Sequence, residues 1–190
     1  MTALGRVGRF GRSLALAVLL FPVGLATHEV AHLAVFSALG VPVTLVVTSW
    51  RLGTTGVPIW GLHAAPTAPI ALDTLVLNNG VGPLAAAALL LVLWAALDRR
   101  SRAARTALLA NVLALVFFAA IEVAYPLLEG VARVDADFLL LPEFNYGTVL
   151  TILVATSAVA AWGGGGAASA GAGGTSRAAR RRGQEPVTSS

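Results

Sequence analysis

The hydrophobic residues of this chain are gathered into four long runs, and the short stretches between the runs hold most of the charges. The runs cover residues 13–39, 72–97, 106–128 and 144–162. Each is close to the ~20 apolar residues that an α-helix needs to cross the hydrocarbon core of a bilayer. The pattern therefore predicts an all-α membrane protein with about four transmembrane helices.

The connection after the first run has a different pattern. Val41–Trp50 is rich in Val and Thr, Gly53–Gly56 is a turn signal, and Val57–Leu62 is again apolar. Two short β-prone runs around a glycine-containing turn predict a β-hairpin. His63 follows the hairpin, and two roles stay open for it: a surface loop residue, or a residue that meets a metal or the substrate.

Composition supports the membrane assignment and limits the chemistry. Of the 190 residues, 57% are hydrophobic and 12% are charged, and the mean hydropathy is +0.81. So few charged residues cannot cover the surface of a soluble domain. The chain has no Cys, which excludes disulfides and thiolate metal sites. Any transition-metal site must use His, Asp, Glu or water.

The basic residues define a topology. All thirteen are Arg, and all but Arg51 and Arg133 cluster in residues 1–12, in the loop at 98–105 and in the tail. An even number of spans puts these clusters on one side of the membrane, which the positive-inside rule identifies as the cytoplasm. We expect a basic N-terminus (1–12), a membrane-embedded core (13–162) and a disordered Gly/Arg-rich tail (163–190), with both termini cytoplasmic in a cell membrane. Because aromatic residues do not interleave with the arginines, no nucleic-acid partner is expected.

A short polar motif lies inside the first apolar run. His28, Glu29 and His32 have the spacing H-E-x-x-H. On a helix, residues four apart share one face, so two imidazoles can hold one zinc ion while the adjacent carboxylate faces a metal-bound water. The alternative is that these side chains form buried helix–helix contacts. Because ionisable residues are costly within the membrane, a functional site is the default hypothesis.

Residue counts from the flanking arginines predict that polar residues of other apolar runs lie at the same depth in the membrane as His28. His28 lies sixteen residues after Arg12, or about 24 Å along a helix axis. Pro83 lies sixteen residues before Arg99, and Glu122 lies seventeen after Arg105. We therefore expect the polar residues of three spans to converge at one height, in the outer part of the membrane.

A catalytic zinc usually has three protein ligands and an open position for water. His28 and His32 supply two of them, and the third must come from elsewhere in the chain. The candidates are Asp135, Asp137, Glu122 and His63. With such a site, Glu29 acts as the general base that transfers the proton of the zinc-bound water to a leaving amine, which is metal-assisted peptide hydrolysis.

A hydrophobic helix with H-E-x-x-H at its C-terminal end resembles the site-2 protease family of intramembrane zinc metalloproteases (the M50 group). In that family a second helix carries Gly-Pro-x-x-Asn. Gly82-Pro83-Leu84-Ala85-Ala86 is similar to it, but Ala86 stands in place of the Asn. The resemblance implies that Pro83 and an asparagine orient the substrate, with Asn79 preferred and Asn78 the alternative in place of the missing Asn. Both asparagines could equally cap the start of a helix.

The same resemblance implies that an aspartate from a later segment is the third zinc ligand. Asp135 is the preferred match and Asp137 the alternate, although neither has the glycine that follows the aspartate in the family. Both could instead be solvated loop acids. Members of the family commonly place the site toward the cytoplasm, whereas the arginines of this chain put it on the outer side.

The predicted function is a zinc metalloendopeptidase that cuts a membrane-associated or membrane-spanning protein or peptide within the lipid bilayer. A substrate strand could add to the edge of the hairpin at 41–62. The alternative is a non-catalytic metal-binding membrane protein of the same fold that acts as a binding or chaperoning module. A metal-ion transporter is a weaker third hypothesis, because one isolated site makes a poor ion path.

Overall fold

A computed structural model describes residues 2–52 and 56–163 of the chain. It contains four long helices and one two-stranded antiparallel sheet among these residues. The helices are α1 (Ala3–Ala38), α2 (Leu72–Ala96), α3 (Arg102–Leu127) and α4 (Pro142–Trp162). Each is long and apolar enough to cross a membrane. The prediction of four apolar helices with a hairpin after the first is confirmed.

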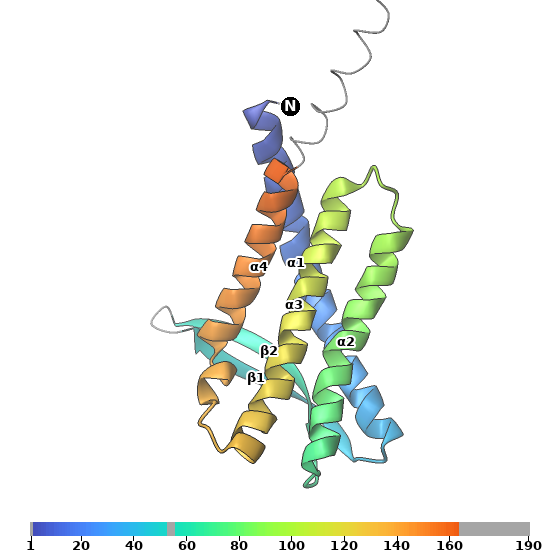
Figure 1. Cartoon of the computed structure of the whole chain (residues 1–190), viewed down its shortest axis with the longest axis vertical. Helices are drawn as coiled ribbons and strands as arrows, with labels where there is room; N and C mark the ends of the chain where they lie inside the picture. Colours follow the sequence, from blue (N-terminus) through green and yellow to red (C-terminus); the bar gives the residue numbers. More distant parts are fainter. Residues whose placement is uncertain (1, 53–55, 164–190) are drawn as a thin grey trace, which may run out of the picture.

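The four helices run side by side as a bundle (Figure 1). The start of α1, the end of α4 and the α2–α3 loop lie at one end of the bundle, drawn at the top of Figure 1. The hairpin and the α3–α4 connection lie near the other end. The arginines of residues 6–12 and 99–105 are thus at the same end, as the topology argument expects.

Local signals explain the limits of α1. Thr2 is the N-cap, and its hydroxyl accepts a hydrogen bond from Gly5 N–H at 3.4 Å. The helix begins ten residues before the apolar run, so the basic segment is helical, and it continues through Pro22. Gly40 has φ +71°, a left-handed conformation that favours glycine and commonly ends helices, and Pro42 follows it.

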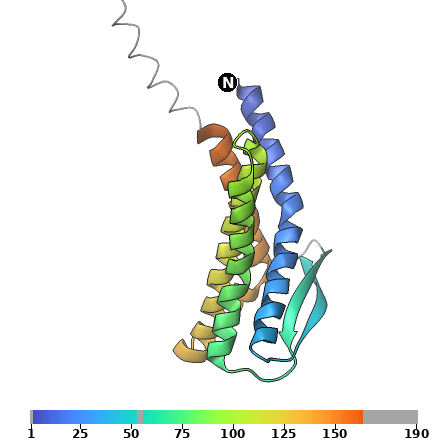
Figure 2. The same ribbon diagram turned by 90° about the vertical axis from the view of Figure 1, so that its right-hand side faces the viewer.

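The hairpin consists of β1 (Val43–Leu52) and β2 (Val57–Pro66), paired from Val43↔Pro66 to Leu52↔Val57. It lies alongside the second half of α1 (Figure 2). β2 extends four residues beyond the expected end at Leu62. His63 therefore belongs to a strand, and the expectation of a loop position for it is wrong.

The connection between α3 and α4 is short and irregular. α3 continues as one π-helical turn, Leu128–Ala132, which ends at Arg133 with a left-handed φ of 54°. A 3₁₀ turn, Asp137–Leu140, leads into α4, and Pro142 occupies the first turn of that helix, where its missing N–H costs nothing. This geometry fixes where the acids of the connection lie.

Small residues allow α1 and α3 to pack closely. Ala17, Ala107, Ala110 and Ala114 are fully buried in one cluster. Small side chains let helix backbones approach one another, as is typical of membrane bundles. Asn111 Nδ2 donates to Ala17 O at 3.0 Å and so joins α3 to α1. The core thus holds α1 against α3, the pair of helices that forms the site below. The predicted tail lies outside the described residues, apart from Gly163.

Candidate metal centre

The two histidines of the motif lie side by side on the buried face of α1. His28 is 2% exposed and His32 is 6% exposed. One helical turn separates them, so both rings project from the same face. Their Nε2 atoms are 2.6 Å apart. Two imidazole nitrogens therefore meet at a single point inside the bundle.

Glu122 of α3 completes this group. Its Oε1 lies 3.2 Å from His28 Nε2, and its Oε2 lies 3.1 Å from His32 Nε2. Glu122 is on the helix packed against α1, at the height that the distance from Arg105 predicts. The expected convergence of polar residues from α1 and α3 is confirmed. We call His28, His32 and Glu122 the triad.

The donor chemistry of the triad fits a metal ion. One ligand atom from each residue lies within 4.8 Å of the other two. Two imidazole nitrogens and one carboxylate form an established ligand set for catalytic zinc, which leaves a fourth position open. An imidazole can bind through Nε2 only when its proton is on Nδ1. The metal-binding form of each histidine therefore needs an acceptor, or at least space, at Nδ1.

Asn78 of α2 meets this need at His32. Its side-chain amide lies 2.8 Å from His32 Nδ1, and both residues are buried. The structure places Nδ2 of Asn78 toward His32 Nδ1 and leaves Oδ1 without a hydrogen-bond partner among the described residues. The metal-binding tautomer needs the amide turned by 180°, so that Nδ1–H donates to Oδ1. His28 Nδ1 is also buried and has no hydrogen-bond partner among the described residues. The two histidines are thus held unequally.

The next turn of α2 makes room for His32. A Cβ atom on Gly82 would come within 2.4 Å of the His32 ring, so only glycine fits there. Asn79 Nδ2 donates to the backbone carbonyl of Glu122 at 2.7 Å and thereby joins α2 to α3. Pro83 is buried beside Gly82. Asn79 and Pro83, expected to orient the substrate, therefore lie next to the triad, and Asn79 contacts protein backbone.

Glu29 is held by the hairpin. Its Oε2 accepts a hydrogen bond from Ala64 N–H of β2 at 2.8 Å, and the residue is 7% exposed. It lines two cavities that flank the triad, of about 230 Å³ and 180 Å³. Glu29 thus borders the cavities beside the histidines, but it is not a member of the group of residues that could hold the metal ion.

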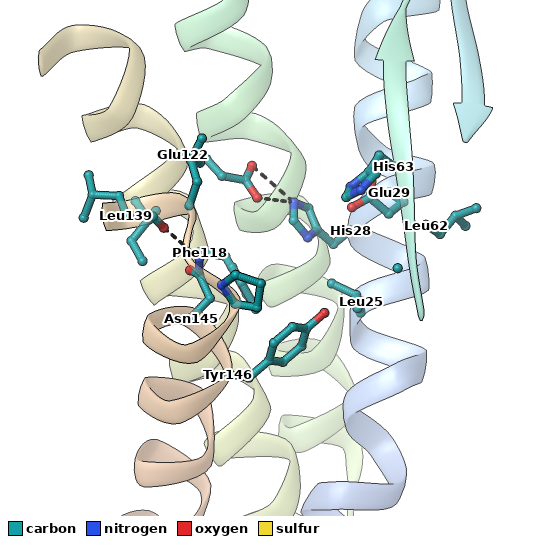
Figure 3. Close-up of a pocket in the computed structure, with 14 residues that line it drawn as sticks. Leu25, His28, Glu29, Leu62, His63, Phe118, Glu122, Leu139, Asn145 and Tyr146 are labelled. Atoms are coloured by element: carbon teal, nitrogen blue, oxygen red, sulfur yellow. Dashed lines mark hydrogen bonds and ion pairs between the residues drawn. The ribbon is translucent and has the colours of Figure 1, made fainter. Parts of the chain in front are cut away.

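The cavity of about 230 Å³ lies between α1, β2, α3 and α4. Its walls are mainly apolar, with Leu25, Phe118 and Ile121 among them. Figure 3 shows the Tyr146 ring of α4 in this cavity, with its hydroxyl directed toward the side that carries Leu25 and His28. The cavity can therefore receive an apolar group next to polar side chains from α1 and α4.

The other candidate ligands lie elsewhere. Asp135 and Asp137 are exposed in the α3–α4 connection, where they form a second acidic group with Glu129. Asp135 Oδ1 accepts a hydrogen bond from Asp137 N–H at 3.1 Å, because the turn before α4 folds back on itself. The structure does not bring either aspartate to the histidines, in contrast to the expectation from family resemblance. His63 lines both flanking cavities, and its Nε2 lies 2.7 Å from Thr48 Oγ1.

No family model, curated protein or solved structure matches this chain.

The sequence did not predict the roles of three residues of the site. Gly82 was noted only as part of a motif, Asn78 only as a possible helix cap or substitute for an asparagine, and Tyr146 not at all. A buried asparagine one turn before a glycine, at the depth of the histidines, is a usable signal for the α2 contacts. Tyr146 carries no such signal, because its place depends on how α4 packs.

Proposed function

We propose that this protein is a membrane-embedded zinc metalloendopeptidase that hydrolyses peptide bonds of membrane-associated or membrane-spanning substrates. The observation that carries this proposal is the convergence of His28, His32 and Glu122 beside the buried carboxylate of Glu29. A purely structural metal site has no need of a fourth polar residue that borders an adjoining cavity. The four apolar helices support the location in the membrane.

The residues divide the chemistry between them. His28 Nε2, His32 Nε2 and a carboxylate oxygen of Glu122 would hold the ion. A bound zinc ion makes water acidic enough to lose its proton near neutral pH. Glu29 accepts a proton through Oε1, since Oε2 is engaged by Ala64 N–H, and returns it to the amine that leaves. The bond to the hairpin keeps this carboxylate at the cavity rather than in contact with the histidines.

The outer edge of β2 can present an extended substrate to this site. In an antiparallel pair, alternate residues direct their N–H and C=O groups away from the partner strand. The N–H of Ala64 points away from β1, because it bonds to Glu29. Pro58 and Pro66 lie an even number of residues from Ala64, so they belong to the same outward-facing set. The outward set therefore also includes Trp60 and Leu62, beside the cavity at Gly61–His63. Deleting the hairpin should abolish cleavage and leave bound zinc unchanged; retained cleavage would contradict this role.

Glu29→Gln tests the catalytic proposal. The amide keeps the shape of the side chain but cannot accept the proton, so hydrolysis should fall by at least about 100-fold. The assay follows release of fluorescent peptides from labelled casein by the full chain in detergent, with zinc measured in parallel. Zinc content should equal that of the wild type. Equal hydrolysis by Glu29→Gln and wild type would exclude Glu29 as the base.

One observation favours a second candidate, a non-catalytic metal-binding protein of the same fold. The bond between Glu29 and Ala64 N–H also serves to attach the hairpin to α1. The two candidates differ in one property of the metal ion: a catalytic ion needs an open coordination position for water, and a non-catalytic one does not. Acetohydroxamate should change the visible spectrum of the Co²⁺-loaded protein if a position is open, whereas an unchanged spectrum would favour the non-catalytic candidate.

A further inference from the structure

Two adjoining cavities lie at the arginine-rich end of the bundle, far from the triad. The larger, about 570 Å³, lies between the first turns of α1 and the start of α3. The smaller, about 300 Å³, lies beside it, next to the Trp94 ring and Ala160 of α4. His28 is about 24 Å along α1 from Arg12, which lines the larger cavity. These cavities are therefore separate from the proposed catalytic site and do not depend on it.

The charged residues that line both cavities are all arginines among the residues that the structure describes. The larger is lined by Arg9, Arg12, Arg100 and Arg102, and the smaller by Arg9, Arg99, Arg102 and Arg105. Asp98, the acid in the adjoining loop, is not in either lining set, and its Oδ1 accepts a hydrogen bond from Arg100 N–H at 2.8 Å. No Asp or Glu among the described residues lines either cavity, and Arg12, Arg100 and Arg102 give the larger cavity a positive lining.

The start of α3 adds to this positive field. Ser101 is the N-cap, but its side chain makes no capping hydrogen bond, and the first turn contains no acid. The first N–H groups of a helix lack intrahelical acceptors and carry the positive end of the helix dipole. Ser101, Ala103 and Ala104 line the larger cavity. A phosphate there would meet backbone donors as well as guanidinium groups.

One arginine is already fixed in place. The Arg105 guanidinium lies 4.0 Å from the centre of the Trp94 ring, and its Nη1 donates to Leu97 O at 2.9 Å. Two exposed apolar residues, Leu4 and Leu16, border the larger cavity on α1. A cavity lined by arginines and by apolar residues of α1 matches a ligand with a phosphate and a hydrocarbon chain.

We propose that the larger cavity, with Arg12, Arg100 and Arg102, binds the phosphate of an anionic phospholipid headgroup. Its volume of about 570 Å³ lies within the range of about 300–1,000 Å³ that is typical of small-ligand sites. Arginines that only determine topology need charge at the membrane surface, not a shared cavity. Basic pockets between helices at the cytoplasmic surface are suited to anionic headgroups. The acyl chains lie along α1 beside Leu16.

Native mass spectrometry of the full chain in detergent tests this proposal. The wild type should bind phosphatidylglycerol at least about tenfold more tightly than phosphatidylcholine with the same acyl chains, because only the former has a net negative headgroup. Arg12→Gln and Arg102→Gln should each weaken phosphatidylglycerol binding about tenfold or more, since a charge-assisted hydrogen bond is lost.

Arg6→Gln is the matched control, because Arg6 is on α1 but outside both lining sets. It should cost at most about fivefold, the effect of one surface charge. Melting temperatures in lipid-free detergent identify variants that fail to fold, and Arg102→Lys retains the charge if Arg102→Gln is unstable. An equal loss for Arg6 and Arg12, or no preference for phosphatidylglycerol, would overturn the proposal. Inorganic phosphate that competes at equal concentration would overturn the assignment to a lipid.

Discussion

Glu122 Oε2 lies 3.1 Å from His32 Nε2, although ninety residues separate the two side chains in sequence. The contact joins α3 to α1 in the interior of the bundle and supplies the third side of the triad. Glu122 is half-buried within an apolar helix, and a carboxylate in such a place needs a compensating cation or hydrogen-bond donors. A shared metal ion satisfies all three groups at once.

Gly82→Ala should disturb the triad through His32. The added Cβ would come within 2.4 Å of the ring, and overpacking of this kind typically costs about 1–3 kcal/mol. We expect a lower melting temperature and weaker zinc binding. Gly11→Ala is the control, because a Cβ on Gly11 meets nothing within 4 Å. It should be neutral or slightly stabilising in its helix. Equal effects of the two substitutions on zinc affinity would contradict the packing argument.

Asn78 should act as a positioning residue for His32. Replacing it with Leu removes the acceptor for Nδ1–H, and losing an outer-shell partner of this kind typically costs about 10–100-fold in metal affinity. Asn78→Asp keeps an acceptor and should retain most of the affinity. Competition with a zinc-sensitive dye measures both variants. If Asp weakens zinc binding as much as Leu does, the side chain at position 78 does not act as the acceptor that positions His32.

Tyr146→Phe should lower hydrolysis and leave the metal in place. The hydroxyl faces the cavity beside His28 (Figure 3), where it can donate to the carbonyl oxygen under attack. Losing one such donor typically lowers kcat by about 100- to 1,000-fold. Tyr125→Phe is the natural control, since Tyr125 is the other tyrosine of the chain and does not line the cavity. A rate unchanged by Tyr146→Phe would exclude this role.

The fold was largely predictable because apolar runs of membrane length leave few alternatives. The helix limits differ from expectation by at most four residues, except at the start of α1. There the difference is ten residues, because capping by Thr2 rather than hydrophobicity determines the boundary. The strand position of His63 was missed because Pro66, close after it, suggested a loop. A proline can also be the last residue of a strand, and whether residues 63–66 pair with β1 depends on tertiary context.

The triad was predictable in part, for two different reasons. The spacing of His28 and His32 fixes their shared face, and counting residues from Arg105 put Glu122 at their depth. Family resemblance instead favoured Asp135. That preference had no support from depth, because Asp135 belongs to a connection outside the apolar runs. An acid inside an apolar span is the stronger physical signal, since only a specific partner makes its burial tolerable.

The identity of the third ligand is the central claim of this account. Zinc bound per chain, measured by inductively coupled plasma mass spectrometry on protein purified without chelators, tests it most directly. The wild type and Asp135→Asn should each bind about one zinc ion per chain, whereas Glu122→Gln should lose it, as His28→Ala should. Zinc retained in Glu122→Gln but lost in Asp135→Asn would contradict the account.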